Sequence, residues 1–304
     1  MFVYNRADHF RATYEALAAC PEAKDSDLFI FSDGWKSEAG KPKVLEVRNA
    51  VAEAAKEEKF RSVTIKESPE NRGLAASVIA GVSEVVERYG SVIVVEDDCC
   101  PSHHFLRYMN RCLCFFESDP KIGAISGYCP VFPFPETYTA DLFLTYRSCS
   151  WGWATWSDRW SKVDWTKAGY QKLLMTPSLI RKLNSCGNDR FLRLYRQTKG
   201  NGSSWSVRFG AHLVLQDQYT VYPRYSYVQN IGCDASGVHS KAEDAESMQV
   251  DLSKAIPDPK VEALTLQPAI QKAMKKHYSA GALSDMKRFA ATAAIVCKER
   301  IKRK

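Results

Sequence analysis

Apolar runs typical of strands alternate with amphipathic segments typical of helices through the first 126 residues of the chain. The runs are short and rich in β-branched or aromatic residues, whereas apolar positions in the longer segments recur at helical spacing. The predicted strands cover residues 2–4, 28–31, 62–65, 92–95 and 122–126, and the predicted helices cover residues 7–19, 43–59, 74–88 and 105–117. This alternation is typical of an α/β protein with a mostly parallel sheet flanked by helices.

The second half of the chain loses this regular alternation. Aromatic residues and turns become frequent, with a strand predicted at 142–146 and a helical stretch at 173–198 that is interrupted at 184–188. Residues 241–267 are polar and punctuated by proline, which favours a linker or a loosely packed wrap. We therefore expect one domain over residues 1–240, followed over 241–304 by a linker and a C-terminal helical extension.

Length and composition indicate a globular protein. The 304 residues are 45% hydrophobic and 25% charged, and no apolar run approaches the roughly 18 to 20 residues of a membrane span. No charged leader followed by an apolar stretch and a small-residue cleavage site opens the chain, so we do not expect secretion. The ten cysteines are scattered without zinc-ribbon spacing, which favours reduced, buried thiols over a disulfide framework.

The formal net charge of +7 is concentrated at the C-terminal end. Residues 271–304 hold ten Lys or Arg and two acidic residues, so the rest of the chain is close to neutral. Apolar residues among these cations, such as Phe289 and Ile295, predict a basic helix that can lie on an anionic membrane surface. The alternative is a solvated helix packed on the domain. Because the basic charge is terminal and the aromatics lie elsewhere, we do not expect nucleic-acid binding.

Three consecutive acids, Glu96, Asp97 and Asp98, follow the strand predicted at 92–95. Open α/β sheets place their ligands at the carboxyl ends of strands. Adjacent carboxylates repel one another unless a cation or a hydrogen-bonded ligand joins them, and hard oxygen ligands suit Mg²⁺ or Mn²⁺ shared with a diphosphate. The alternative interpretation is a solvated acidic turn after a strand.

The absence of two glycine-rich motifs narrows the choice among phosphate-using proteins. The chain has no Gly-x-x-x-x-Gly-Lys-Ser/Thr phosphate loop and no Gly-x-Gly-x-x-Gly after the first strand, which disfavours an ATPase and a nicotinamide dehydrogenase. No Asp-x-Asp follows the first strand either, which weakens the case for a phosphatase.

Five motifs, taken in order, resemble a known enzyme family. They are Val-Tyr-Asn-Arg at 3–6, Phe-Ser-Asp-Gly at 31–34, Val-Val-Glu-Asp-Asp at 94–98, Trp-Gly-Trp-Ala-Thr-Trp at 151–156 and Asn-Ile-Gly-Cys-Asp-Ala-Ser-Gly-Val-His at 230–239. With these motifs the chain resembles bacterial GT-A-type glycosyltransferases, and it is similar also to the N-acetylglucosaminyltransferase I type, whose metal motif is Glu-Asp-Asp. The resemblance implies a GT-A, Rossmann-like fold with a nucleotide-binding half at 1–127 and an acceptor half at 128–240.

The resemblance also implies roles for the residues that hold a sugar donor. Arg6 and Asp33 match positions that hold the uridine part of a nucleotide sugar. Asp98 matches the acid that binds Mn²⁺ (or Mg²⁺) directly, while Asp97 and Glu96 match neighbours that contact the ribose and the sugar or the groups that surround them.

Two further motifs are matched in the second half. Trp151, Gly152 and Trp153 match a loop that shapes the sugar and acceptor pocket, where aromatic planes stack on sugar C–H faces and glycine allows close backbone approach. His239 matches a histidine that the family places near the metal or the diphosphate.

The catalytic base is where this chain departs from the family pattern. An inverting enzyme needs a carboxylate to deprotonate the acceptor hydroxyl. The matching position, often Asp in the family, is Ser206 here, and a serine hydroxyl is far too weak a base at neutral pH. We therefore expect another acid to act as base, Asp189 before Asp217, unless the acceptor itself assists or the chemistry differs.

Together these observations predict a cytoplasmic, metal-dependent glycosyltransferase, peripheral on the inner face of the membrane. Its donor would be a UDP-sugar in preference to a GDP-sugar, its acceptor a growing surface glycan or lipid-linked saccharide, and inversion is implied by the resemblance alone. Two alternatives stay open. A nucleotidyltransferase of nucleotide-sugar synthesis would normally carry a glycine-rich loop after the first strand, and a degenerate carbohydrate-binding module is suggested by Ser206.

Overall fold

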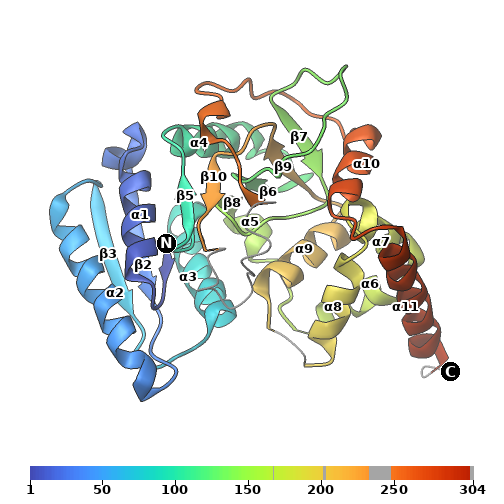
Figure 1. The fold of residues 1–304 in the computed structure, drawn as a ribbon, viewed down its shortest axis with the longest axis horizontal. Coiled ribbons are helices and arrows are strands. Elements are labelled where there is room, and N and C mark those ends of the chain that lie inside the picture. Colours follow the sequence, from blue (N-terminus) through green and yellow to red (C-terminus); the bar gives the residue numbers. More distant parts are fainter. Residues whose placement is uncertain (167, 201–202, 233–247, 302–304) are drawn as a thin grey trace.

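A computed structural model describes residues 1–166, 168–200, 203–232 and 248–301 as a mixed α/β fold (Figure 1). Its strands are β1 (Phe2–Val3), β2 (Asp27–Ser32), β3 (Ser62–Glu67), β4 (Ser91–Val94), β5 (Cys99–Pro101), β6 (Ile122–Ser126), β7 (Leu142–Thr145), β8 (Trp153–Trp156), β9 (Tyr219–Pro223) and β10 (Val228–Asn230). Its α-helices are α1 (Ala7–Ala18), α2 (Lys41–Ala54), α3 (Leu74–Tyr89), α4 (Phe105–Phe116), α5 (Ser157–Trp160), α6 (Gln171–Met175), α7 (Pro177–Leu183), α8 (Arg190–Thr198), α9 (Trp205–Leu215), α10 (Pro268–His277) and α11 (Ala282–Ile301).

The N-terminal strands form the parallel part of the sheet, as the βα alternation predicts. β1 pairs with β2 and β2 with β3, both in parallel. The amide nitrogen of Phe2 donates to the carbonyl oxygen of Val95 at 3.0 Å, and a parallel bridge joins Phe2 to Glu96. The spatial order is therefore β3-β2-β1-β4, and the carboxyl ends of these strands share one edge.

The remaining strands correct the expectation of a mostly parallel sheet. β8 lies between β4 and β6 and is antiparallel to both, while β9 is parallel to β6 and antiparallel to β7. A separate antiparallel pair joins β5 to β10. Within the described residues, three of the seven pairings between these strands are parallel, in addition to the parallel bridge between Phe2 and Glu96. The difference arises because the tryptophan-rich segment forms β8, which inserts between β4 and β6.

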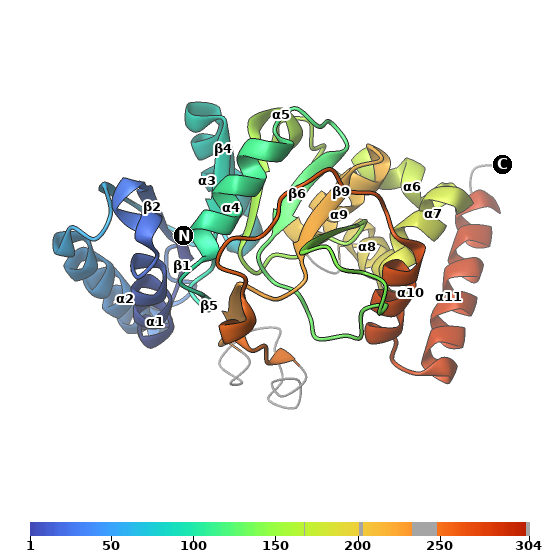
Figure 2. The same ribbon diagram turned by 90° about the horizontal axis from the view of Figure 1, so that it is seen from above.

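Helices cover both faces of the sheet (Figures 1 and 2). Successive side chains of a strand point to opposite faces, so Phe2 and Val3, adjacent in β1, enter different hydrophobic clusters. The cluster around Val3 contains apolar residues of α1, α2 and α4, whereas the cluster around Phe2 contains those of α3, α5 and α9. The two clusters hold the sheet between layers of helices.

The helical stretch predicted at 173–198 is divided into α6, α7 and α8. α7 and α8 are separated by a 3₁₀ turn at Asn184–Cys186, which lies at the predicted interruption. The turn is followed by Gly187, whose φ is 135°. A φ in this range favours glycine, so the helix ends here for a local reason.

The C-terminal extension is helical, as predicted, and α10 contributes to the core. Ile270 and Met274 of α10 are fully buried and pack in a cluster with Phe143 of β7 and Tyr222 of β9. α11 packs beside α6 and α8 (Figure 1). No helix in the described part of the chain is long and apolar enough to span a membrane. The division of the chain at residue 240 stays a prediction.

Candidate functional site

Five of the predicted donor-site residues follow three strands that end at the same edge of the sheet. Arg6 comes three residues after β1, Asp33 directly follows β2, and Glu96 to Asp98 follow β4. Because these strands are parallel, the topology brings the predicted residues to one edge. The roles of these residues in donor binding stay predictions.

Arg6 bridges the last two acids of the acidic run. Its Nη2 donates to Asp98 Oδ2 at 2.8 Å and also to Asp97 Oδ1. Asp97 is 4% exposed, and Thr13 Oγ1 of α1 donates to its carbonyl oxygen at 2.8 Å. The first helix of the chain therefore holds this loop at two points, through its capping residue Arg6 and through Thr13.

The acidic run carries more negative charge than one arginine neutralises. Burial, together with the charges of Asp98 and Asp97, raises the pKa of Glu96 to about 8, although Arg6 opposes the shift. Burial also raises the pKa of Asp97, against the opposing effect of Arg6. A proton or a cation therefore stabilises this loop near neutral pH.

These carboxylates fit a divalent ion that takes few protein ligands. Within the described ranges, no group of three His, Cys, Asp or Glu side chains is arranged to hold a metal. Mg²⁺ and Mn²⁺ in nucleotide sites need only one or two carboxylates, because phosphate oxygens and water complete the shell. Asp98 can supply such a ligand once Arg6 moves from its Oδ2. His239, the other predicted ligand, lies outside the described residues.

Asp33 is engaged by the loop that precedes α3. Its Oδ1 accepts from the amide nitrogens of Gly34 and Arg72, each at 2.9 Å. Its Oδ2 accepts from the amide of Gly73 at 2.9 Å and from Asn71 Nδ2 at 3.2 Å. These four bonds use the usual acceptor capacity of a carboxylate, so Asp33 fixes the 71–73 loop in this conformation.

A hollow lies beside Asp33 at this edge. It has a volume of about 340 Å³ and is lined by Asp33, Ser68 and Arg72, together with side chains of β3 and α3. The hollow is large enough for a planar base, and Asp33 would shape it through the loop that it holds. The sequence alone gave no sign of this positioning role, although Asn71-Arg72-Gly73 could be recognised as a turn before a helix.

The end of β10 closes over the acidic run. The amide nitrogen of Ile231 donates to the carbonyl oxygen of Asp98 at 2.8 Å. A Cβ placed on Gly232 would collide with Asp98 Oδ2 and lie 2.8 Å from Arg6 Nη1. A larger residue at this position would therefore have to displace the Asp98 carboxylate and the Arg6 guanidinium from their pairing. Neither Gly232 nor Thr13 was a predicted site residue; the signal for Gly232 was its place in the Asn-Ile-Gly motif.

The tryptophan motif is split between the edge of the sheet and the core. Gly152 has φ of 60°, and its carbonyl accepts from the Gly127 amide at 2.6 Å, at the carboxyl end of β6. Trp151 is half-buried and meets Tyr128 edge to face, with 4.6 Å between ring centroids. Trp151 and Gly152 are therefore placed near the edge that carries the acidic run.

Trp153 requires a correction, because its side chain belongs to the core. It is 1% exposed and stacks on Trp205 with ring centroids 4.9 Å apart. It also packs against Trp160 and Phe209. A side chain buried in this way cannot stack on a sugar, so its predicted contact with the donor is not supported.

Asp189, the preferred candidate for the base, is held by arginines. Arg147 donates to both of its carboxylate oxygens, at 3.1 and 3.3 Å, and Arg193 approaches at 3.6 Å. Arg147 in turn stacks on Tyr278, 3.6 Å from the ring centroid. Although burial opposes it, Arg147 lowers the pKa of Asp189, so the carboxylate is a weak base while this pair is intact.

Ser206 and Asp217, the other two residues considered for the catalytic base, lie in different parts of the fold. Ser206 lies in the first turn of α9, with its Oγ 3.1 Å from the Oγ of the capping Ser204. Asp217 precedes β9 and bonds Lys121, which precedes β6. Since β4, β6 and β9 are parallel, Asp217 lies at the edge opposite the acidic run.

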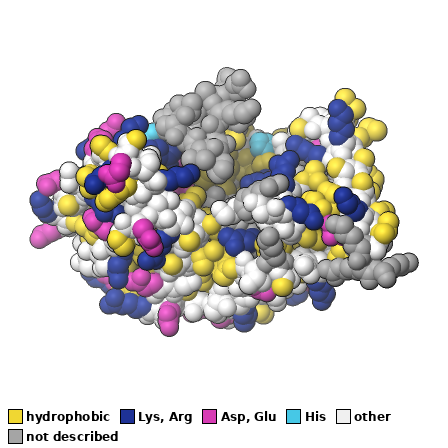
Figure 3. Space-filling view, turned by 90° about the horizontal axis from the view of Figure 1, so that it is seen from below, with side chains coloured by type: hydrophobic (Ala, Val, Ile, Leu, Met, Phe, Trp, Pro, Cys, Tyr) yellow, Lys and Arg dark blue, Asp and Glu magenta, His cyan; other side chains and the backbone are white. Residues whose placement is uncertain are grey.

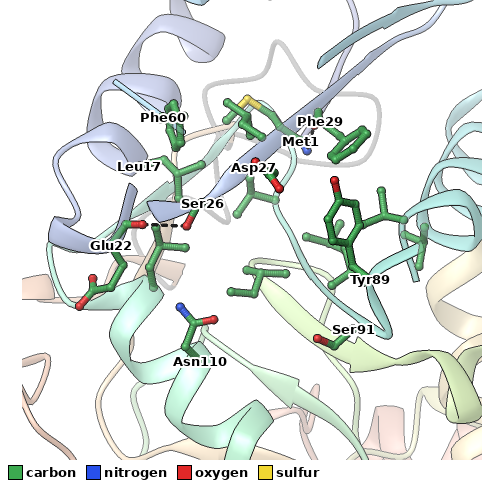
Figure 4. A pocket seen from close by; sticks show the side chains of 18 of the residues that line it. Met1, Leu17, Glu22, Ser26, Asp27, Phe29, Phe60, Tyr89, Ser91 and Asn110 are labelled. Atoms are coloured by element: carbon green, nitrogen blue, oxygen red, sulfur yellow. Dashed lines mark hydrogen bonds between the residues drawn. The ribbon is translucent and has the colours of Figure 1, made fainter. Parts of the chain in front are cut away.

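A larger hollow, of about 390 Å³, is lined by none of the predicted site residues (Figure 4). It is found at the amino ends of β2 and β4, where Asp27 and Ser91 line it. Leu17, Phe29 and Phe60 form part of its apolar wall. Its lining also includes Phe31 and Val95, so the hollow runs along these strands from their amino ends toward the edge that carries the acidic run.

These features define a mixed α/β protein with an acidic, arginine-bridged site at the carboxyl edge of its sheet. No protein-family model matches the chain, and no curated protein does. Among solved structures it is distantly similar to a mannosyltransferase from Pyrobaculum calidifontis in complex with GDP-Man and Mn²⁺. The two are 16% identical with a TM-score of 0.36, over 52% of this chain and 44% of the other. The chain spans less than half the length of that protein, and so distant a likeness carries no functional conclusion.

Proposed function

We propose that the protein is a metal-dependent GT-A-type glycosyltransferase that uses a nucleoside-diphosphate sugar. The observation that carries the proposal is the acidic run after β4, in which three adjacent carboxylates have one bridging arginine, Arg6, and burial together with the charges of Asp98 and Asp97 raises the pKa of Glu96 to about 8. A divalent ion and a diphosphate would complete the charge balance there. The hollow beside Asp33 lies at the same edge and would take the base.

Each residue at this edge has a distinct part in the proposed reaction. Asp98 would hold the ion, and Arg6, which now bridges Asp97 and Asp98, would then be available to contact the donor. Asp97 and Glu96 contact the ribose and the sugar, while Asp33 shapes the hollow for uracil through the 71–73 loop. When bound, the ion offsets the charge that develops on the departing nucleoside diphosphate.

A screen of nucleotide sugars by thermal shift, with Mn²⁺ present, tests the donor site. A UDP- or GDP-sugar at about one hundred times its Kd should raise the Tm by roughly 5 °C through mass action. Asp98→Ala should abolish the Mn²⁺-dependent part of this shift, whereas Asp25→Ala, an exposed acid elsewhere, should keep it. If no nucleotide stabilises the protein, or if Asp98→Ala behaves as wild type, the assignment of the acidic run is wrong.

Asp189 stays the proposed general base for an inverting reaction, and its pairing with Arg147 makes that role testable. Asp189→Asn should reduce kcat at saturating donor by about 100-fold or more while the donor-induced Tm shift persists. Asp217→Asn is the matched control and should turn over normally, because Asp217 lies at the opposite edge. Normal turnover of Asp189→Asn with a lower Tm would instead give Asp189 a purely structural role.

The degenerate carbohydrate-binding module is the second candidate function, favoured by Ser206 and by the arginine-bound state of Asp189. It predicts stabilisation by a nucleotide sugar or saccharide without turnover of any donor, with or without Mn²⁺.

The acceptor proposed for the glycosyltransferase is a surface glycan or a lipid-linked saccharide. A lipid-linked acceptor would give peripheral attachment to the inner face of the membrane a purpose.

A further inference from the structure

The solvent-facing side of α11 is apolar along the helix. Leu283, Met286 and Phe289 follow one another at three-residue spacing and are 67%, 68% and 77% exposed. Residues three apart lie on the same face of a helix, and Ile301, 73% exposed, continues this face at the other end. Figure 3 shows hydrophobic side chains gathered at this end of the molecule, over α11. We call these four side chains the α11 stripe.

Cations lie beside the α11 stripe. Lys287 and Lys298 are exposed, and because they are eleven residues apart, three turns of helix place them on one side. Helix α10, which precedes α11 in the chain, also carries the exposed Lys272, Lys275 and Lys276. This end of the molecule therefore presents an apolar helix face within a basic surrounding.

The two acids of α11 are turned away from the stripe and already paired. Asp285 accepts from Ser279 at 2.6 Å and pairs with Arg288. Glu299 pairs with Lys199 of the body at 3.2 Å. Because both acids are paired in this way, they do not offset the positive charge of the exposed Lys287 and Lys298 on the outward face of α11.

The inner side of α11 anchors the helix without using the stripe. Thr292 is 9% exposed, and Ile295 and Val296 pack on the cluster that contains Leu173 and Leu194. The fold therefore does not require Phe289 or Met286 to be apolar. A contiguous apolar face that the fold leaves in solvent marks an interaction site.

We propose that the α11 stripe docks on an anionic lipid surface. An interfacial helix buries its apolar face at the headgroup boundary while lysines beside it contact anionic headgroups. A second copy of the chain is disfavoured as the occupant, since pairing two α11 stripes would bring lysines against lysines. The proposal does not depend on the sugar-donor chemistry, although it would bring the protein to a lipid-linked acceptor.

Co-sedimentation of the full chain with vesicles tests this docking. The probes are vesicles of phosphatidylcholine alone and vesicles with one third phosphatidylglycerol, at low salt and at 0.5 M salt. We expect binding to the anionic vesicles, at least about tenfold weaker binding to the neutral ones, and loss of binding at high salt, because salt screens the attraction between the lysines and the anionic headgroups. Point variants are preferable to truncation, which would remove the buried side chains of α10.

Two variants separate the apolar and basic contributions. Phe289→Ser with Met286→Ser, and Lys287→Gln with Lys298→Gln, should each weaken binding about tenfold or more. Leu45→Ser with Leu74→Ser removes exposed apolar side chains elsewhere, at 41% and 50% exposure, and should bind as wild type.

Two readouts keep the result interpretable. An unchanged Tm and an unchanged nucleotide-induced shift in each variant show that the fold and the donor site are intact. No binding to anionic vesicles, equal binding by all variants, or a dimer in solution that Phe289→Ser with Met286→Ser dissociates would each overturn the proposal. Failure of every nucleotide to bind would leave it unaffected.

Discussion

At the scale of single residues, the environment of Glu96 makes the stability of the fold depend on pH. Glu96 is half-buried beside two other carboxylates, and its pKa is raised to about 8. In the unfolded chain a glutamate titrates near 4.3. The folded state therefore binds this proton more tightly than the unfolded chain does. The resulting contribution to the free energy of unfolding is fully present below about pH 4.5 and is lost as pH rises to about 8.

Substituting Glu96 isolates this contribution. Without divalent cations, Glu96→Gln should be more stable than wild type at pH 8.5, by about 1 to 3 kcal/mol, and close to wild type at pH 5. Urea unfolding at both pH values measures the difference, with the exposed Glu46→Gln as control. A difference that does not change with pH would contradict the proposed protonation of Glu96.

At the scale of elements, the consecutive helices α10 and α11 each carry a methionine, but one is buried and the other is exposed. Met274 of α10 is fully buried among Phe143 and Tyr222, whereas Met286 of α11 is 68% exposed. The sequence predicted a helical C-terminal extension, without its division into two helices. It could not tell which apolar side chains enter the core, because that depends on strands β7 and β9, more than forty residues earlier in the chain.

Substitution of Met274 and of Met286 tests directly whether α10 belongs to the core and the outward face of α11 does not. Met274→Ala should lower the free energy of unfolding by about 2 to 5 kcal/mol through lost contacts and a cavity. Met286→Ala, the matched control, should change it by less than about 0.5 kcal/mol. Urea denaturation with a common slope for both variants gives the two values. Equal effects would mean that α10 does not contribute to the core as described.

At the scale of the whole molecule, local patterns predicted the first four strands and their intervening helices because each is a continuous periodic segment. The position of the acidic run followed from this, since a residue after a buried parallel strand must lie at the carboxyl edge. The place of β8 between β4 and β6 was not predictable locally, because it depends on pairing across sixty residues. For the same reason the burial of Trp153 and the edge occupied by Asp217 emerged only from the fold.

Arg6 gives the site its own internal counter-ion. Under the proposed function, a metal arriving alone would have to compete with this tethered positive charge, because the guanidinium already occupies Asp98 Oδ2. A diphosphate offers Arg6 a new partner and so lowers the cost of that exchange. Metal and donor should therefore each raise the affinity for the other by the same factor, as thermodynamic reciprocity requires. The protein would remain largely metal-free at low donor concentration and become loaded as donor accumulates.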